Sequence, residues 1–105
     1  MDYMCLSVRQ PFASAIVWCE KTIEIRSWKT DYRGPLVICS SGRDFKAKYD
    51  DGTSEILPGG YALGVVNLTN IRPLKISDGD AAWFEREDWN DLKGQYAWIL
   101  EDCTN

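Results

Sequence analysis

Residues 21–28 read Lys-Thr-Ile-Glu-Ile-Arg-Ser-Trp, and Tyr-Arg-Gly-Pro-Leu follows at residues 32–36. The first stretch alternates between apolar and polar side chains, which is typical of a strand. We expect Ile23 and Ile25 to face a core. The opposite face then carries the alternate residues Thr22, Glu24, Arg26 and Trp28. Gly-Pro at 34–35 marks a turn into the next strand, so this part of the chain predicts a β-rich fold.

Short apolar, β-prone runs on both sides of this stretch predict further strands. They cover residues 6–8, 36–40, 61–68 and 96–101, and residues 71–76 extend or follow the third of these. A helix is expected over 11–19, where Pro11 suits a first helical turn, and shorter helices over 44–49 and 81–88. Because helices and strands do not alternate regularly, we expect an α+β fold: a small, bent β-barrel of about five to six strands with two or three short helices.

Two strands carry more specific signals. Gly64 lies inside the run 61–68 and predicts a bend or bulge there. The last strand alternates between two apolar faces, one with Tyr96, Trp98 and Leu100 and the other with Ala97 and Ile99.

Composition limits the function. The chain has 105 residues, which predicts one domain over 1–105, and its net charge is −4. That charge argues against sequence-blind binding to duplex DNA, but a local basic cleft remains compatible with it. No run is long and apolar enough to span a membrane, and no signal peptide is visible, so we expect a cytoplasmic protein. The five Trp residues are core candidates, although an exposed Trp beside a cation would be a stacking surface for a base.

Histidine is absent, which removes Ser-His-Asp, Cys-His and His-based zinc chemistry. The four Cys residues, 5, 19, 39 and 103, are widely spaced, and we expect them to be reduced, buried thiols. The acidic turns at 50–51 and 78–80 lack EF-hand spacing. We therefore expect no metal site and no cofactor.

Two segments together resemble the ASCH domain family. They are Leu-Ser-Val-Arg-Gln-Pro-Phe-Ala at 6–13 and the stretch 21–36 quoted above, and the similarity resumes at 62–66 and 96–100. The resemblance implies a PUA-like β-barrel over the single domain 1–105 and a link to RNA, including coactivation and RNA processing. Carried over by position, it implies a polar cleft formed by Arg9, Gln10, Lys21, Glu24, Arg26, Ser27, Trp28 and Ser40.

One difference from the family affects catalysis. Members that hydrolyse an acetylated cytidine have Lys-Thr-Ile-Thr-Ile-Arg, whose second Thr is the nucleophile. In this chain Glu24 stands at that position. A catalytic role would therefore use Lys21 and Glu24, with Glu24 activating water and Lys21 stabilising an oxyanion.

Three functions remain open. The first is a module, with a role in transcription or translation regulation, that binds single-stranded RNA, a nucleotide or a modified nucleoside. In such a module, Glu24 accepts a hydrogen bond from the N–H edge of a base, Arg26 and Arg9 bind phosphate, and Trp28 stacks on a base. The second is a nucleoside amidohydrolase or ribonuclease using Lys21 and Glu24. The third is a protein-interaction adaptor, suggested by the many Trp residues. The oligomeric state is left open.

Overall fold

The computed structural model describes residues 4–103, which form seven strands and three short helices. The strands are β1 (Met4–Arg9), β2 (Ile23–Arg26), β3 (Gly34–Ser41), β4 (Phe45–Lys48), β5 (Ser54–Leu57), β6 (Ala62–Pro73) and β7 (Tyr96–Glu101). The helices are α1 (Phe12–Val17), α2 (Gly79–Ala82) and α3 (Trp89–Leu92), with 3₁₀ turns at Ile76–Asp78 and Arg86–Asp88. The α+β class predicted from the sequence is confirmed.

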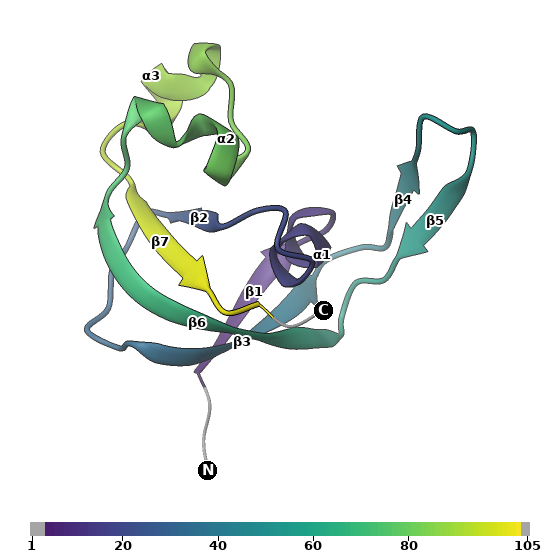
Figure 1. The fold of residues 1–105 in the computed structure, drawn as a ribbon, viewed down its shortest axis with the longest axis horizontal. Coiled ribbons are helices and arrows are strands. Elements are labelled where there is room, and N and C mark those ends of the chain that lie inside the picture. Colours follow the sequence, from purple (N-terminus) through teal and green to yellow (C-terminus); the bar gives the residue numbers. More distant parts are fainter. Residues whose placement is uncertain (1–3, 104–105) are drawn as a thin grey trace.

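Five strands form one curved sheet in the order β1-β3-β6-β7-β2. β1 and β3 are parallel, and the other pairs are antiparallel. The long strand β6 pairs with β3 along its first half and with β7 along its second half, so it carries the curvature (Figure 1). The edge strands β1 and β2 do not pair with each other within residues 4–103, so the sheet does not close into the expected barrel. A side chain links the two edges instead: Arg26 Nη2 donates to the Ser7 carbonyl oxygen at 2.6 Å.

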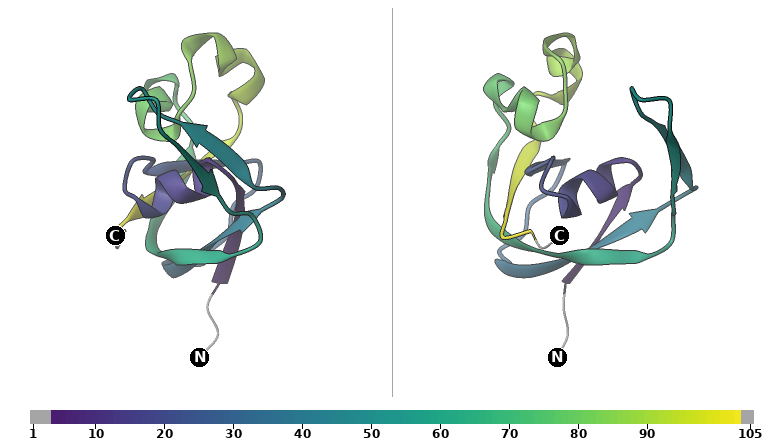
Figure 2. Two further views of the ribbon diagram at one scale, coloured as in Figure 1. Left: turned by 90° about the vertical axis from the view of Figure 1, so that its right-hand side faces the viewer. Right: turned by 45° about the vertical axis from the view of Figure 1, so that its right-hand side comes forward.

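The main core lies between α1 and the concave face of this sheet (Figure 2). It is built from Leu6, Val8, Ala13, Ile16, Val17, Leu36, Ile38, Val66, Leu68, Trp98 and Leu100. Gly64 allows α1 to approach β6, since a Cβ there would lie 3.2 Å from Val17 Cγ1. The β3–β6 register also shifts next to Gly64, between Ile38 and Cys39, which confirms the bend or bulge predicted there.

A second, smaller apolar cluster covers the other face of β2 and β7. Its buried residues are Ile23, Leu74, Ala82 and Ala97, and Ile25 and Ile99 pack against it. β7 therefore contributes Trp98 and Leu100 to the main core and Ala97 and Ile99 to this second cluster, as its alternation predicted. The expectation that Ile23 and Ile25 share an apolar face is confirmed as well.

The predicted helix over 44–49 is wrong. Residues 45–48 form β4, which pairs antiparallel with β5 in a separate two-stranded sheet. Lys46 and Lys48 alternate with Phe45 and Ala47, and this two-residue period favours a strand over a helix. The hairpin and the α2–α3 segment stand on opposite sides of α1 (Figures 1 and 2).

The other two helices are shorter than predicted because left-handed residues end them. Cys19, with φ of 67°, follows the end of α1, so the helix does not fill 11–19. Trp83, with φ of 63°, ends α2, and the expected helix over 81–88 is divided into α2, a 3₁₀ turn and α3.

The prediction of four buried thiols is also wrong. Cys19 and Cys103 form a disulfide that joins the end of α1 to the segment after β7, and Cys5 is exposed. Cys39 is half-buried; burial and the neighbouring Cys5 raise the pKa of its thiol. No helix in residues 4–103 is long and apolar enough to cross a membrane.

Candidate functional site

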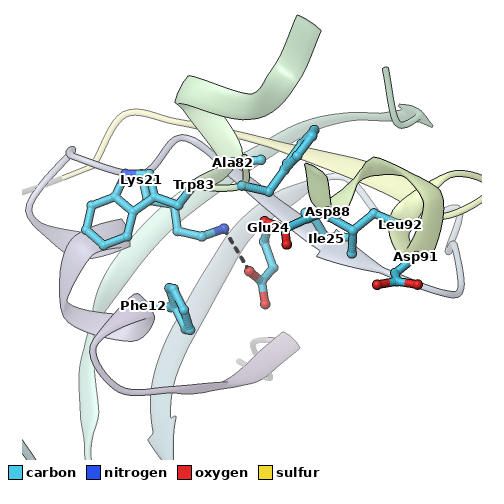
Figure 3. Close-up of a pocket in the computed structure, with 10 residues that line it drawn as sticks. Phe12, Lys21, Glu24, Ile25, Ala82, Trp83, Asp88, Asp91 and Leu92 are labelled. Carbon is cyan, nitrogen blue, oxygen red and sulfur yellow. Dashed lines mark hydrogen bonds and ion pairs between the residues drawn. The ribbon is translucent and has the colours of Figure 1, made fainter. Parts of the chain in front are cut away.

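A cavity of about 390 Å³ opens between α1, β2 and the α2–α3 segment (Figure 3). This size lies within the range of small-ligand sites. Its lining is Phe12, Lys21, Glu24, Ile25, Ala82, Trp83, Phe84, Asp88, Asp91 and Leu92. Three aromatic rings and a buried ion pair thus surround one cavity.

Lys21 and Glu24 form the polar end of the cavity. Glu24 also contacts Arg26, which does not line the cavity, so one carboxylate lies between two cations. Lys21 Nζ donates to Glu24 Oε1 at 3.0 Å, and Arg26 Nη2 donates to Glu24 Oε2 at 2.9 Å. The ammonium also donates to the Ile23 carbonyl oxygen. Lys21 is only 3% exposed and Glu24 9%. The pair is therefore buried, and the structure differs from a solvent-exposed ion pair of little energetic value.

The position of Glu24 follows from the curvature of the sheet. Glu24 pairs across strands with Trp98, so its side chain lies on the concave face that also carries the main core. The apolar face of β2 packs on the second cluster. Both faces of β2 are thus covered. The alternating apolar and polar residues of 21–28 do not reveal this, because such a pattern predicts one buried and one exposed face.

Burial changes the proton affinity of Lys21. Loss of hydration lowers the pKa of the Lys21 ammonium from its ordinary value of 10.5, because the charged form is penalised in a buried site. The charge and hydrogen bond of Glu24 act in the opposite direction, and the Arg26 charge adds a smaller lowering. The net direction is downward, so Lys21 yields its proton more readily than an exposed lysine.

Arg26 has donor capacity left over. Nη2 serves both Glu24 and the Ser7 carbonyl oxygen. The Nε–H is buried and has no acceptor among residues 4–103. A buried donor without an acceptor costs about 1–3 kcal/mol, so this atom weakens the fold locally.

Trp83 forms a wall of the cavity and is held from two directions. Its indole Nε1 donates to the Glu20 carbonyl oxygen at 3.2 Å, and its ring meets Phe12 edge to face at 6.1 Å. The left-handed backbone at a non-glycine residue costs roughly 1–2 kcal/mol. The side-chain contacts keep Trp83 over the cavity in spite of that cost, and the residue remains 42% exposed.

Phe12 and two acidic residues complete the cavity. The Phe12 ring lies 6.0 Å from Lys21 Nζ, at cation–π distance. Asp88 and Asp91 lie across the cavity from Lys21 (Figure 3), and Asp88 Oδ2 accepts from the Glu85 backbone N–H at 3.0 Å. Within residues 4–103, no group of three or more Cys, Asp or Glu is placed to hold a metal ion.

The structure brings together three of the eight residues proposed from the sequence: Lys21, Glu24 and Arg26. Arg9 and Gln10 line a different cavity, on the hairpin side of α1. The Gln10 side chain is occupied within the fold, since Oε1 accepts from the Ser14 N–H at 2.9 Å and Nε2 donates to the Pro58 carbonyl oxygen at 3.0 Å.

The other three lie outside both cavities. Ser40 is buried and exchanges hydrogen bonds with the Tyr61 backbone. Ser27 is exposed, and neither it nor Trp28 lines a cavity with Lys21. The Trp28 ring packs edge to face on buried Trp98 at 4.7 Å, and its carbonyl oxygen accepts from Trp98 Nε1. These contacts hold Ser40 and Trp28 in the fold, away from the Lys21–Glu24 cavity.

Sequence reasoning missed the aromatic residues of the cavity. Phe12 and Trp83 are far apart in the chain, and no local periodicity connects them. The adjacent Trp-Phe pair at 83–84, in an otherwise polar stretch, was the available signal.

Comparison with known proteins assigns the fold. The sequence model of the ASCH domain family matches residues 6–102, which is nearly the whole chain. The chain belongs to the ASCH domain family. An ASCH protein from Zymomonas mobilis has a similar crystal structure, with a TM-score of 0.66 at 18% identity over 95% of this chain and 67% of that one. A mutant of the same protein gives a TM-score of 0.65 at 18% identity, over 95% and 69%. These likenesses show the fold alone.

One curated relative matches a short part of this ASCH domain. Activating signal cointegrator 1 of Mus musculus is 49% identical over 39 residues, which are 37% of this chain and 7% of that protein. The match thus spans a small fraction of the mouse protein, and its name describes that protein alone.

Proposed function

We propose that this ASCH domain binds single-stranded RNA and takes one base into the cavity between Phe12, Trp83 and the Lys21–Glu24 pair. The observation that carries the proposal is the meeting of exposed aromatic rings with a fixed, buried ion pair in one cavity. Membership of a family linked to RNA supports the choice of ligand.

The aromatic rings would supply affinity. Stacking on an aromatic side chain contributes about 1–3 kcal/mol per base and tolerates any base. Trp83 is suited to this because its ring is partly exposed and its orientation is fixed by the hydrogen bond to Glu20. Phe12 packs against it edge to face, so the wall is already formed without a ligand.

The charged groups would supply selectivity. The Glu24 carboxylate can accept from the N–H edge of a base, while Lys21 can donate to a base carbonyl. Arg26 lies outside the cavity lining and would act indirectly, by holding Glu24 Oε2 in place at 2.9 Å. The acidic residues Asp88 and Asp91 on the rim would disfavour a phosphate there, so the base would enter first.

A second function is favoured by one specific observation. The lowered pKa of Lys21 suits a general base or acid, and Glu24 lies within hydrogen-bond distance of it. The same cavity would then cleave RNA or hydrolyse a modified nucleoside. Incubation of the protein with oligonucleotides and acetylated cytidine, followed by mass spectrometry, tests this: products that disappear in Lys21→Met support catalysis, and unchanged substrates exclude it.

Binding is tested by fluorescence anisotropy with a labelled single-stranded RNA at low salt. Trp83→Ala should weaken binding about tenfold, because it removes one stacking surface worth roughly 1.4 kcal/mol. Trp18→Ala is the matched control, since Trp18 is similarly exposed, at 40%, and lies outside the cavity. Equal affinities of the two variants would contradict the proposed base site, and lack of RNA binding by the wild type would refute the function.

A further inference from the structure

A second cavity, of about 530 Å³, lies on the other side of α1, where β1 ends and the β4–β5 hairpin begins. It is lined by Arg9, Gln10, Ser41, Gly42, Arg43, Asp44 and Phe45. It shares no residue with the first cavity, and the base site described above does not use it.

The charges at this cavity favour an anion. Arg9 and Arg43 are both exposed, and neither forms an ion pair among residues 4–103. The carboxylate in the lining, Asp44, uses Oδ1 to accept from the Gly59 N–H at 2.9 Å. Two guanidinium groups thus face one carboxylate that is already engaged, and a guanidinium fork matches the oxygens of a phosphate.

The walls of this cavity are held in place by the backbone. The turn at 58–60 packs tightly on the start of the hairpin, since a Cβ at Gly59 would lie 2.3 Å from the Gly42 carbonyl oxygen. Gln10 Nε2 anchors the same turn through the Pro58 carbonyl oxygen at 3.0 Å. Arg43 therefore projects from a segment fixed on both sides, and little ordering is needed before binding.

An aromatic ring adjoins the two cations. Phe45 lines the cavity and is 39% exposed, so its ring offers a base a surface to stack on. An acidic peptide would also match the arginines, but it would gain little from this ring. The pairing of cations with an exposed aromatic favours a nucleotide.

The two cavities are joined by a short piece of chain. Gln10 lines the second cavity and Phe12 the first, and Cα atoms two residues apart are separated by at most about 7 Å. We propose that Arg9, Arg43 and Phe45 form a second subsite, which binds a backbone phosphate and the neighbouring nucleotide of the RNA strand whose base occupies the Lys21–Glu24 cavity. This inference rests on the proposed function and specifies its ligand: an oligonucleotide that passes over residues 9–12, rather than a free nucleoside.

The test is the salt dependence of binding. Anisotropy with a labelled single-stranded octanucleotide is measured over a series of salt concentrations for wild type, Arg9→Gln, Arg43→Gln and the double variant. Each lost phosphate contact should reduce the slope of log affinity against log salt by about 0.7. Because Arg9 and Arg43 share one phosphate in this subsite, the double variant should lose about 0.7 of slope in total, while its affinity for a nucleoside in calorimetry stays at the wild-type value. Arg86→Gln is the control, because Arg86 is exposed on the α2–α3 side and lines neither cavity.

The outcomes separate this inference from the function on which it rests. If the Arg9 and Arg43 variants match Arg86→Gln while Lys21→Met and Trp83→Ala weaken RNA binding, the second subsite is refuted and the base site stands. A competition measurement gives a second outcome. If an acidic peptide of equal charge displaces the labelled RNA at the same concentration as unlabelled RNA, a nucleotide subsite is also refuted. If wild type binds no RNA, both proposals fail.

Discussion

Replacing Glu24 by Gln should destabilise the fold strongly, and more at neutral pH than at high pH. The substitution preserves shape but removes the negative charge between Lys21 and Arg26. Removal of one partner from a buried pair costs about 3–5 kcal/mol. Since the Arg26 side chain is 23% exposed, we expect the lower end, about 3 kcal/mol. For a domain of this size that is a fall in melting temperature of about 12–24 °C.

The pH dependence follows from Lys21. Its pKa in the folded state is already below the ordinary 10.5, and the loss of Glu24 removes the influence that raises it, so it falls further. A lysine with a lowered pKa in the folded state reduces stability below that pKa, and the penalty is relieved as the pH rises towards the unfolded value. The stability difference between wild type and Glu24→Gln should therefore be largest near pH 7 and narrow towards pH 10.

Urea denaturation at pH 7, 8.5 and 10 measures this difference. Glu101→Gln is a matched control, because Glu101 is exposed on β7, and its effect should stay within about 0.5 kcal/mol. In a Lys21→Met background, the stability difference caused by Glu24→Gln should be the same at pH 7 and pH 10, because no lysine is left to lose its proton. A difference between wild type and Glu24→Gln that is constant or grows with pH would refute the account of Lys21 as a buried cation held by Glu24.

Two further predictions concern stability outside the cavity. Asp78→Asn should cost about 2 kcal/mol near pH 7, because Asp78 accepts two bonds from Arg72 at 2.8 Å and one from the Lys75 N–H. Arg72 holds the pKa of that carboxyl below its ordinary 3.8, so its stabilisation is present above pH 3.8 and is lost as the pH falls through the lower folded-state value. In thermal melts from pH 7 to pH 2, the melting temperatures of wild type and Asp78→Asn should converge as the pH falls. A difference in melting temperature that stays constant with pH would contradict this prediction. Cys103→Ser should lower the free energy of unfolding by up to about 4.5 kcal/mol, since the Cys19–Cys103 disulfide spans 84 residues. Urea denaturation midpoints with and without dithiothreitol check this. Dithiothreitol should lower the midpoint of the wild type and leave that of Cys103→Ser unchanged. An equal change of midpoint in both proteins would contradict the prediction.

The elements that the sequence predicted well are those whose periodicity is local. The alternation of 96–101 correctly placed Trp98 and Leu100 opposite Ala97 and Ile99, because both faces of β7 meet apolar partners. Gly64 correctly indicated the irregularity in β6. The hairpin at 45–57 was missed because its exposed strands carry charges on both faces and bury few side chains, so composition suggested a helix.

The candidate site was half predictable. The polar residues Lys21, Glu24 and Arg26 lie within six positions of one another, and strand geometry already places Glu24 and Arg26 on one face. The aromatic wall depends on the path of the chain after β6, which brings Trp83 to Phe12. The burial of Glu24 depends on sheet curvature. The Trp-Phe pair at 83–84 marks an aromatic position in the sequence, but no local pattern shows that it meets Phe12 or that Glu24 is buried.

The most direct test of the central claim is an NMR titration of the ¹⁵N-labelled protein with a short single-stranded RNA. The account predicts amide and indole shifts concentrated at residues 12, 21–26 and 82–84 that are lost in Lys21→Met. The absence of shifts there, or shifts unchanged in that variant, would contradict a base site at the Lys21–Glu24 pair.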